Sequence, residues 1–171
     1  MSTESTSPPI MYTLVSKDEK ELPISEKAIR HSTILQSVVS NCAFFKDGKK
    51  MDSIPVVNVD SKHLEMVIRW CEHHKDDEFP PSRRLPRNAE IPEWDHEFLP
   101  KNNEDLFHLI NAVNYLDIGE LMNYCCKSVA MMAKGKSPED FRILFGIPTD
   151  EEYDQERATE ESSSVDKKAA K

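Results

Sequence analysis

Four prolines lie close together near the middle of this chain: Pro80, Pro81, Pro86 and Pro92. Proline has no backbone N–H and a fixed φ, so clustered prolines exclude both a helix interior and a central strand. We therefore expect residues 76–93 to form a linker at a domain boundary. Strand-like segments occur only before this linker, and the residues after it show helical patterns, which together favour the α+β fold class.

Three short segments ahead of the linker are typical of β-strands. Residues 11–15 combine aromatic and aliphatic side chains with β-branched neighbours, and residues 22–24 include Pro23, which an edge strand tolerates. Residues 54–59 read I-P-V-V-N-V. This nearly continuous apolar run predicts a strand that is buried on both faces. The three segments together predict a small sheet.

Helices are expected between and after these strands. Ser25 is a typical N-cap for one helix or two short ones, and the polar residues 41–53 predict a loop. Asp60 or Ser61 can cap the next helix. From Leu64 onward its apolar residues recur at i, i+3, i+4 and i+7, the spacing of an amphipathic helix.

The chain after the linker is predicted to be helical over residues 94–157. Apolar residues repeat at helical spacing over 106–116 and again over 121–132. Ser137 is followed by a proline and two acidic residues, which predicts the capped start of a third, short helix. A glycine and a proline that follow residue 145 should end that helix.

Both ends of the chain have too few apolar side chains to offset the entropy cost of ordering. We therefore expect residues 1–10 and the acidic tail, 158–171, to be disordered. The first segment also lacks the basic and apolar regions of a signal peptide. Because no apolar run approaches the roughly 18 residues that span a bilayer, we expect no membrane association and a location in the cytoplasm and nucleus.

Charge and motifs exclude several classes of function. With 22 Lys and Arg against 31 Asp and Glu, the net charge is −9, which argues against nucleic acid as a partner. The sequence has no phosphate-cradling glycine loop and no G-x-S-x-G motif. We therefore predict that the protein is not an enzyme and needs no cofactor.

A metal site is not expected either. Cys71, His73 and His74 do not converge on one point when they lie on a helix, and no second pair stands at zinc-finger spacing. Cys125 and Cys126 are adjacent, and neighbouring helical residues point about 100° apart. One of these two thiols should therefore lie in the core and the other at the surface.

The C-terminal helices carry more apolar side chains than short helices can bury. Side chains beside or beyond the inward stripes include Phe107, Tyr124, Met131, Met132, Phe141, Phe145 and Ile147. They could form an exposed protein-docking surface, to which methionine adapts well. They could equally pack on the N-terminal domain, and periodicity alone leaves the two possibilities open.

Several long motifs occur in one order along residues 11–157. They are R-W-C-E-H-H-K-D-D at 69–77, I-P-E-W-D-H-E-F-L at 91–99, the segment 107–117 that ends in N-Y-L-D, and the segments 126–130 and 134–139. In these motifs the chain resembles the S-phase kinase-associated protein 1 family. Members of that family link F-box proteins to the cullin scaffold of SCF-type E3 ubiquitin ligases.

The resemblance implies a BTB/POZ-like three-stranded sheet packed with helices, plus a C-terminal helical extension. Residues 11–75 would be the N-terminal part of that domain, and residues 94–157 would complete it and receive the F-box. Asn114 and Tyr115 match the pair that faces the cullin. The positions that correspond to the F-box-binding surface are Phe107, Ile110, Leu121, Cys126, Val129, Phe141, Phe145 and Ile147. Ordinary burial frequencies suggest that about a third of these pack in the monomer core instead.

The predicted function is thus that of a non-catalytic adaptor with a cullin and F-box proteins as partners, with a homodimer through the BTB part as a further possibility. One alternative is an elongin-C-like adaptor, although the helices after Asp117 argue against it. Another is a self-associating BTB scaffold without a ligase role. Three local departures from the family pattern are the lysines of the 41–53 segment, where many relatives are acidic, the lack of a glycine in the turn at 17–20, and the short connection between Ile147 and Thr149 without the terminal Trp-Cys pair of many relatives. The last departure predicts that the final helix forms incompletely.

Overall fold

The computed structural model describes residues 10–41, 45–46, 49–50, 53–78 and 90–155. These residues form two compact units, one up to Val129 and one from Ala130 onward, and each is described by itself. The expected disordered segments fall outside the described residues, apart from Ile10, and so does the 79–89 part of the expected linker.

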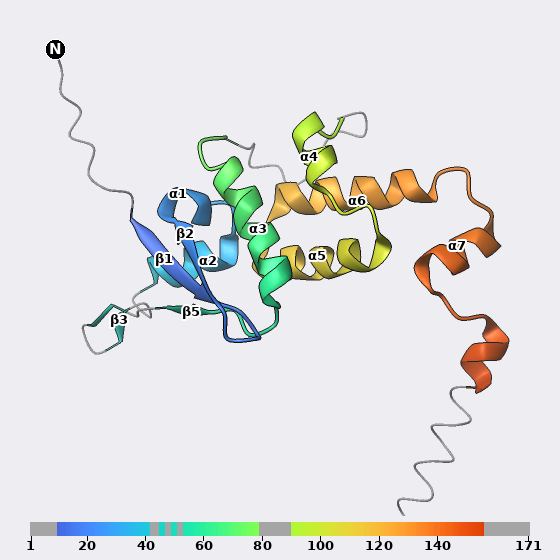
Figure 1. Cartoon of the computed structure of the whole chain (residues 1–171), viewed down its shortest axis with the longest axis horizontal. Coiled ribbons are helices and arrows are strands. Elements are labelled where there is room, and N and C mark those ends of the chain that lie inside the picture. The colour runs from blue at the N-terminus through green and yellow to red at the C-terminus, as the bar shows by residue number, and fades with distance from the viewer. Residues whose placement is uncertain (1–9, 42–44, 47–48, 51–52, 79–89, 156–171) are drawn as a thin grey trace, which may run out of the picture. The chain divides into compact units, whose positions relative to one another are not determined.

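A three-stranded sheet forms one layer of the first unit, as predicted (Figure 1). Strand β1 (Met11–Val15) is central, with β2 (Glu21–Ser25) antiparallel on one side and β5 (Ile54–Pro55) parallel on the other. Leu14 and Ile24 are completely buried. The sheet therefore contributes alternate side chains to the core, as period-2 strands do.

The strand predicted over 54–59 is shorter than expected. Pairing in β5 stops at Pro55, although the N–H of Val56 still donates to the carbonyl of Val15 at 2.7 Å. The chain then turns, with Val57 60% exposed between the buried Val56 and Val59. An apolar run does not by itself distinguish a strand buried on both faces from a strand followed by a turn.

Two loop regions also differ from expectation. The segment 41–53 contains a two-stranded antiparallel hairpin, β3 (Phe45–Lys46) with β4 (Lys49–Lys50), where the sequence predicted only a loop. The glycine-free turn between β1 and β2 closes because Glu19 adopts a left-handed conformation with φ of 61°. Residues other than glycine pay a steric penalty there.

Side-chain caps start the helices of the first unit at the positions that the sequence indicated. Ser25 accepts from the N–H of Ala28 and begins α1 (Glu26–Ile29). Asp60 accepts from the N–H of His63 at 3.0 Å and begins α3 (Ser61–His73). A second serine cap begins α2 (Thr33–Ser40), so the segment forms two short helices.

The helices on either side of the proline-rich segment share one core. Helix α4 (Glu93–Phe98) is followed by α5 (Asn103–Leu116), which packs against α3, and by α6 (Gly119–Ala133). The boundary between the compact units falls inside α6, and not at residues 76–93 as the prolines suggested. Prolines interrupt secondary structure, but they do not prevent the flanking helices from packing together.

A buried polar network holds α4 to the end of α3. The indole N–H of Trp70 donates to Asp95 Oδ1 at 2.6 Å, and His74 Nε2 lies 3.1 Å from the same oxygen. His74 Nδ1 lies 2.6 Å from Asp77 Oδ2. His74 is therefore buried between two carboxylates at the end of α3.

The second unit contains the rest of α6, then α7 (Pro138–Phe145) and helical residues 150–155. As predicted, Ser137 and Asp140 form a reciprocal capping box, Pro138 occupies the first turn, and Gly146 ends α7 in a left-handed conformation. In the part of the chain that the structure describes, none of the helices has the length and apolarity needed to cross a membrane.

Candidate protein-interaction surfaces

Asn114 and Tyr115 lie in the last turn of α5, and both side chains are exposed. An alternative to a role in binding is that Asn114 caps the helix and Tyr115 packs at the edge of the core. Asp117 takes the C-cap position instead, with φ of 51°, and its N–H donates to the carbonyl of Asn114 at 3.2 Å. Neither side chain is thus needed to close the helix, and both remain available to a partner.

The end of α5 is held in place by the N-terminus of α2. The hydroxyl of Ser32 donates to the carbonyl of Leu116 at 2.5 Å, and the N–H of Thr33 donates to the carbonyl of Asp117 at 3.3 Å. These bonds satisfy carbonyl groups that a helix terminus otherwise leaves unpaired. Asn114 and Tyr115 therefore lie on a helix end that hydrogen bonds from α2 hold in place.

A hollow of about 200 Å³ opens beside this pair, at the corner between α5 and α6. Its lining combines the buried Val113 and Ile118 with the half-buried Met122 and the exposed Asn114. An apolar floor with a polar rim is the usual composition of a side-chain pocket at a protein interface. The hollow could thus receive one apolar side chain of a partner that contacts Asn114.

The predicted F-box-binding residues fall into both units. In the first unit Phe107, Ile110 and Val129 are half-buried and Cys126 is exposed, so all four retain contact with solvent. Leu121 is wrongly assigned, because its side chain is 0% exposed and belongs to the core. It occupies the inward stripe of α6 and has no surface to offer a partner.

The second unit leaves its three predicted residues in contact with solvent. Phe141 is 37% exposed and Ile147 is 47% exposed, while Phe145 is half-buried. The rings of Phe141 and Phe145 contact each other, with centroids 4.4 Å apart. None of the described residues 130–155 is buried, so this unit places its apolar side chains at its surface.

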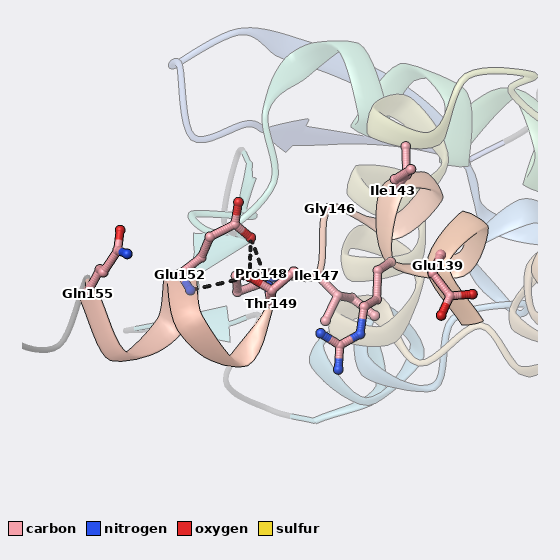
Figure 2. A pocket seen from close by; sticks show the side chains of 9 residues that line it. Glu139, Ile143, Gly146, Ile147, Pro148, Thr149, Glu152 and Gln155 are labelled. Carbon is pink, nitrogen blue, oxygen red and sulfur yellow. Dashed lines mark hydrogen bonds between the residues drawn. The ribbon is translucent and has the colours of Figure 1, made fainter. Parts of the chain in front are cut away.

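A hollow of about 840 Å³ lies between α7 and the helical residues 150–155 (Figure 2). Ile147 and Ile143 line it, together with Arg142, Glu139 and Glu152. Phe141 and Phe145 are not among its lining residues.

Sequence reasoning missed Ile143, which is 82% exposed. The i, i+3, i+4 stripe of α7 selects Phe141, Leu144 and Phe145 and passes over it. The signal that could have identified Ile143 is its apolar side chain at a position outside that stripe.

The remaining surplus side chains divide between core and surface. Tyr124 is buried, and its burial together with the neighbouring Glu120 raises the pKa of its phenol. Met131 is exposed. Periodicity had left open whether these side chains are exposed or packed in the core, and each possibility proves correct for some of them.

The two adjacent cysteines behave as predicted. Cys125 is buried, and burial raises the pKa of its thiol to about 12, whereas Cys126 is exposed. Burial likewise raises the pKa of Cys71. Among the residues that the structure describes, no three His, Cys, Asp or Glu side chains are grouped so that they could hold a metal ion.

Comparison with known proteins identifies related sequences over most of the chain. The tetramerisation domain of the Skp1 family matches residues 10–76, and its dimerisation domain matches residues 119–164. The "Suppressor of kinetochore protein 1" of Schizosaccharomyces pombe is 37% identical over 86% of this chain and 94% of its own length. The chain belongs to the Skp1 family.

Other relatives of this Skp1-family chain carry names that refer to a complex. The "E3 ubiquitin ligase complex SCF subunit sconC" of Arthroderma benhamiae is 40% identical, over 87% of this chain and 92% of its own length. The protein of the same name from Aspergillus terreus is 38% identical, over 92% of this chain and 97% of its own. These matches confirm the resemblance that the sequence motifs indicated, and with it the α+β POZ-type fold.

The two family domains correspond to separate parts of the Skp1-family chain. The tetramerisation domain covers the sheet and α1 to α3, and the dimerisation domain begins at α6. Asn114 and Tyr115 lie between them, on α5. No comparison assigns a role to any of the predicted site residues, so these assignments stay predictions.

Proposed function

We propose that this chain is a non-catalytic adaptor that links F-box substrate receptors to a cullin scaffold in an SCF-type E3 ubiquitin ligase. Membership of the Skp1 family supports this role, as do the relatives named as subunits of an SCF complex. The observation that carries the proposal is the second unit, whose described residues bury none of their apolar side chains. Such a surface is stable in water mainly when a partner covers it.

The F-box side of the adaptor would consist of two groups of residues. Phe107, Ile110, Cys126 and Val129 belong to the first unit, and the group in the second unit is formed by Phe141, Phe145, Ile147 and also Ile143. Leu121 is omitted because it is buried. Exposed isoleucine and phenylalanine side chains suit an amphipathic helical partner, which buries its apolar face in a groove.

The cullin side would be the end of α5. Asn114 and Tyr115 are exposed there, next to the hollow at the α5–α6 corner. A tyrosine on a fixed helix end has the properties of an interface hot spot, since it loses little entropy on binding.

The proposed mechanism needs no chemistry from this chain. An adaptor that binds two partners at once raises the effective concentration of the substrate near the ubiquitin-loaded enzyme. Such action requires only that the two surfaces do not overlap. We place it in the cytoplasm and nucleus, which fluorescence imaging of the tagged full chain would test.

The decisive experiment separates the two surfaces. Asn114→Lys combined with Tyr115→Lys should abolish co-purification with the cullin, because two charges would be buried in the interface without partners. F-box binding, measured by calorimetry, should remain unchanged. Loss of both activities, or of neither, would contradict the assignment of Asn114 and Tyr115.

A matched control keeps the change in charge the same. Glu97→Lys also raises the net charge by two, because a lysine replaces a glutamate at an exposed position on α4. This variant should retain both the cullin and the F-box protein. If it loses the cullin as the double variant does, the effect is electrostatic and not local to α5.

Self-association is the main competing function. Light scattering of the full chain, alone and with an F-box peptide, distinguishes the two. A dimer that the peptide leaves unchanged would favour a self-associating scaffold, whereas a complex of defined stoichiometry with the peptide would favour the adaptor.

A further inference from the structure

Thr149 stands at the rim of the hollow in the second unit (Figure 2). It is exposed and belongs to the short non-helical connection between α7 and residues 150–155. Its hydroxyl donates to Glu152 Oε2 at 3.0 Å and its N–H donates to the same oxygen at 2.8 Å. Its Oγ1 is therefore close to both the solvent and the lining of the hollow.

Acidic residues follow this threonine without interruption. Asp150, Glu151 and Glu152 occupy the next three positions, and all are exposed. The segment on the other side, Gly146 to Pro148, is also exposed and not helical beyond the cap of α7. Thr149 caps the helical residues 150–155, because its Oγ1 also accepts from the N–H of Glu152 at 3.3 Å. An exposed hydroxyl at such a helix start that is followed by acids fits a kinase whose substrate groove is basic.

Arg142 faces this group of acids. Arg142 lines the same hollow, and its Nη2 lies 3.6 Å from Asp150 Oδ1. Hydrogen bonds from Thr149, and to a smaller extent the charge of Arg142, hold the pKa of Glu152 below its usual value. Arg142 thus lies close to Asp150, the residue after Thr149, and its guanidinium could bind a new anion there.

We propose that Thr149 is a phosphorylation site for an acid-directed serine/threonine kinase, and that its phosphorylation weakens F-box binding at the hollow. The second part rests on the proposed function. In the reaction Thr149 Oγ1 attacks the γ-phosphorus of ATP, the bond between this phosphorus and the β–γ bridging oxygen breaks, and ADP leaves. The hydroxyl proton passes to the base of the kinase.

The physical effect follows from charge. A phosphothreonine carries about −1.5 to −2 charges at pH 7. It repels the Glu152 carboxylate that the unmodified hydroxyl contacts, and it draws Arg142 toward itself. The strongly hydrated dianion then lies beside Ile143 and Ile147, so covering these side chains with an apolar partner requires its partial desolvation.

The first test is chemical. The purified full chain is incubated with ATP and an acid-directed kinase, and phosphate is located by tandem mass spectrometry. We expect phosphate on Thr149 and its loss in Thr149→Ala. The matched control is Ser137→Ala. It removes the hydroxyl that caps α7, as the Thr149 hydroxyl caps residues 150–155, but Ser137 is followed directly by Pro138. The control should be phosphorylated at Thr149 as the wild type is.

The second test measures the environment of the phosphate. In ³¹P NMR titrations, the second pKa of the phosphate should be lower in the wild type than in Arg142→Gln, because a nearby cation favours the dianion. Equal values, or no phosphate on Thr149 while a reference acidic peptide is phosphorylated, would overturn the assignment.

The third test concerns regulation. We expect phosphorylation to lower the affinity for an F-box domain by roughly tenfold, because covering the apolar side chains then requires desolvation of the phosphate and of the Arg142 paired with it. An unchanged affinity would refute the regulatory part. If the unmodified chain does not bind the F-box domain at all, the proposed function fails, while the mass and ³¹P results still decide the phosphorylation site.

Discussion

The two compact units of this protein are built on different principles. In the first unit, the helices and the sheet share a core that includes Trp70, Leu109 and Leu116, each almost completely buried. In the second, none of the described residues 130–155 is buried, and α7 is defined by its capping box, its first-turn proline and its glycine cap. The first unit depends on tertiary packing, and the second depends on local signals and leaves its apolar side chains in contact with solvent.

The largest expected effect tests this contrast directly. Leu109→Ala should lower the free energy of unfolding of the first unit by about 2–5 kcal/mol, because it leaves a cavity in the core. Ile143→Ala in α7 should change stability by no more than about 0.5 kcal/mol, because the side chain is already in water. Urea unfolding followed by tryptophan fluorescence measures the first unit, which holds both Trp70 and Trp94, and amide exchange in α7 measures the second. Similar losses in the two variants would mean that the second unit has a core of its own.

Acid should affect the first unit more than the second. Hydrogen bonds from Ser61 and from Lys62 hold the pKa of Asp18 and of Asp105 at about 2. Because these pKa values are lower than in the unfolded chain, their contribution is present above about pH 4 and is lost as the pH falls toward 2.

Replacing one of these carboxylates should therefore flatten the acid dependence. In Asp18→Asn, the free energy of unfolding should fall less steeply between pH 5 and pH 2 than in the wild type. Glu152→Gln removes a carboxylate of lowered pKa from the second unit and serves as the control. Glu152→Gln should leave the pH dependence of the free energy of unfolding of the first unit unchanged. An equal effect of the two variants would contradict the independence of the two units.

Two serine caps allow the same change in each unit. Ser137→Ala should destabilise α7 by about 1 kcal/mol, visible as faster amide exchange in α7 alone. Ser32→Ala should lower the stability of the whole first unit, because its hydroxyl also donates to the Leu116 carbonyl. If Ser137→Ala slowed or accelerated exchange throughout α3 and α5, the units would not be independent.

The smallest expected effect concerns the turn between β1 and β2. Glu19→Gly should stabilise the first unit by about 0.5–1 kcal/mol, because glycine adopts a positive φ without a steric penalty. Glu21→Gly, in the neighbouring strand, should destabilise by a similar amount. Thermal unfolding measures both, and a loss of stability in Glu19→Gly would show that its side chain makes a contact that outweighs the strain.

Local signals in the sequence predicted the elements that local physics decides. The helices that begin at Ser25, Asp60 and Ser137 start where their caps lie, since a cap bonds to amides only two or three residues away. The amphipathic stripe of α3 was also correct in its main members, Leu64, Val67 and Cys71. Periodicity alone indicated strands before the proline-rich segment and helices after it. The Skp1-family motifs added the POZ-type arrangement of these elements.

The errors arose where distant residues decide the outcome. The run 54–59 ends its strand early because its pairing with β1 stops at Pro55 and the chain then turns. Residues 76–93 do not separate two packed units, because α3 and α5 pack across them. Of the eight predicted F-box-binding residues, Leu121 is buried. Ile143 was missed because its exposure depends on which side chains pack against α7, and the sequence pattern does not show this.

By itself, the sequence determined the family, the class of fold, the positions of most helix starts and the absence of a recognisable catalytic motif, because these depend on residue identities and on spacings of a few positions. Only the tertiary structure decided which apolar side chains are covered and where the chain divides into units. Burial depends on residues that are distant in the sequence and adjacent in space. A hydrophobic period of 3.6 or 2 residues predicts which face of a helix or strand is apolar, but not which element packs against that face.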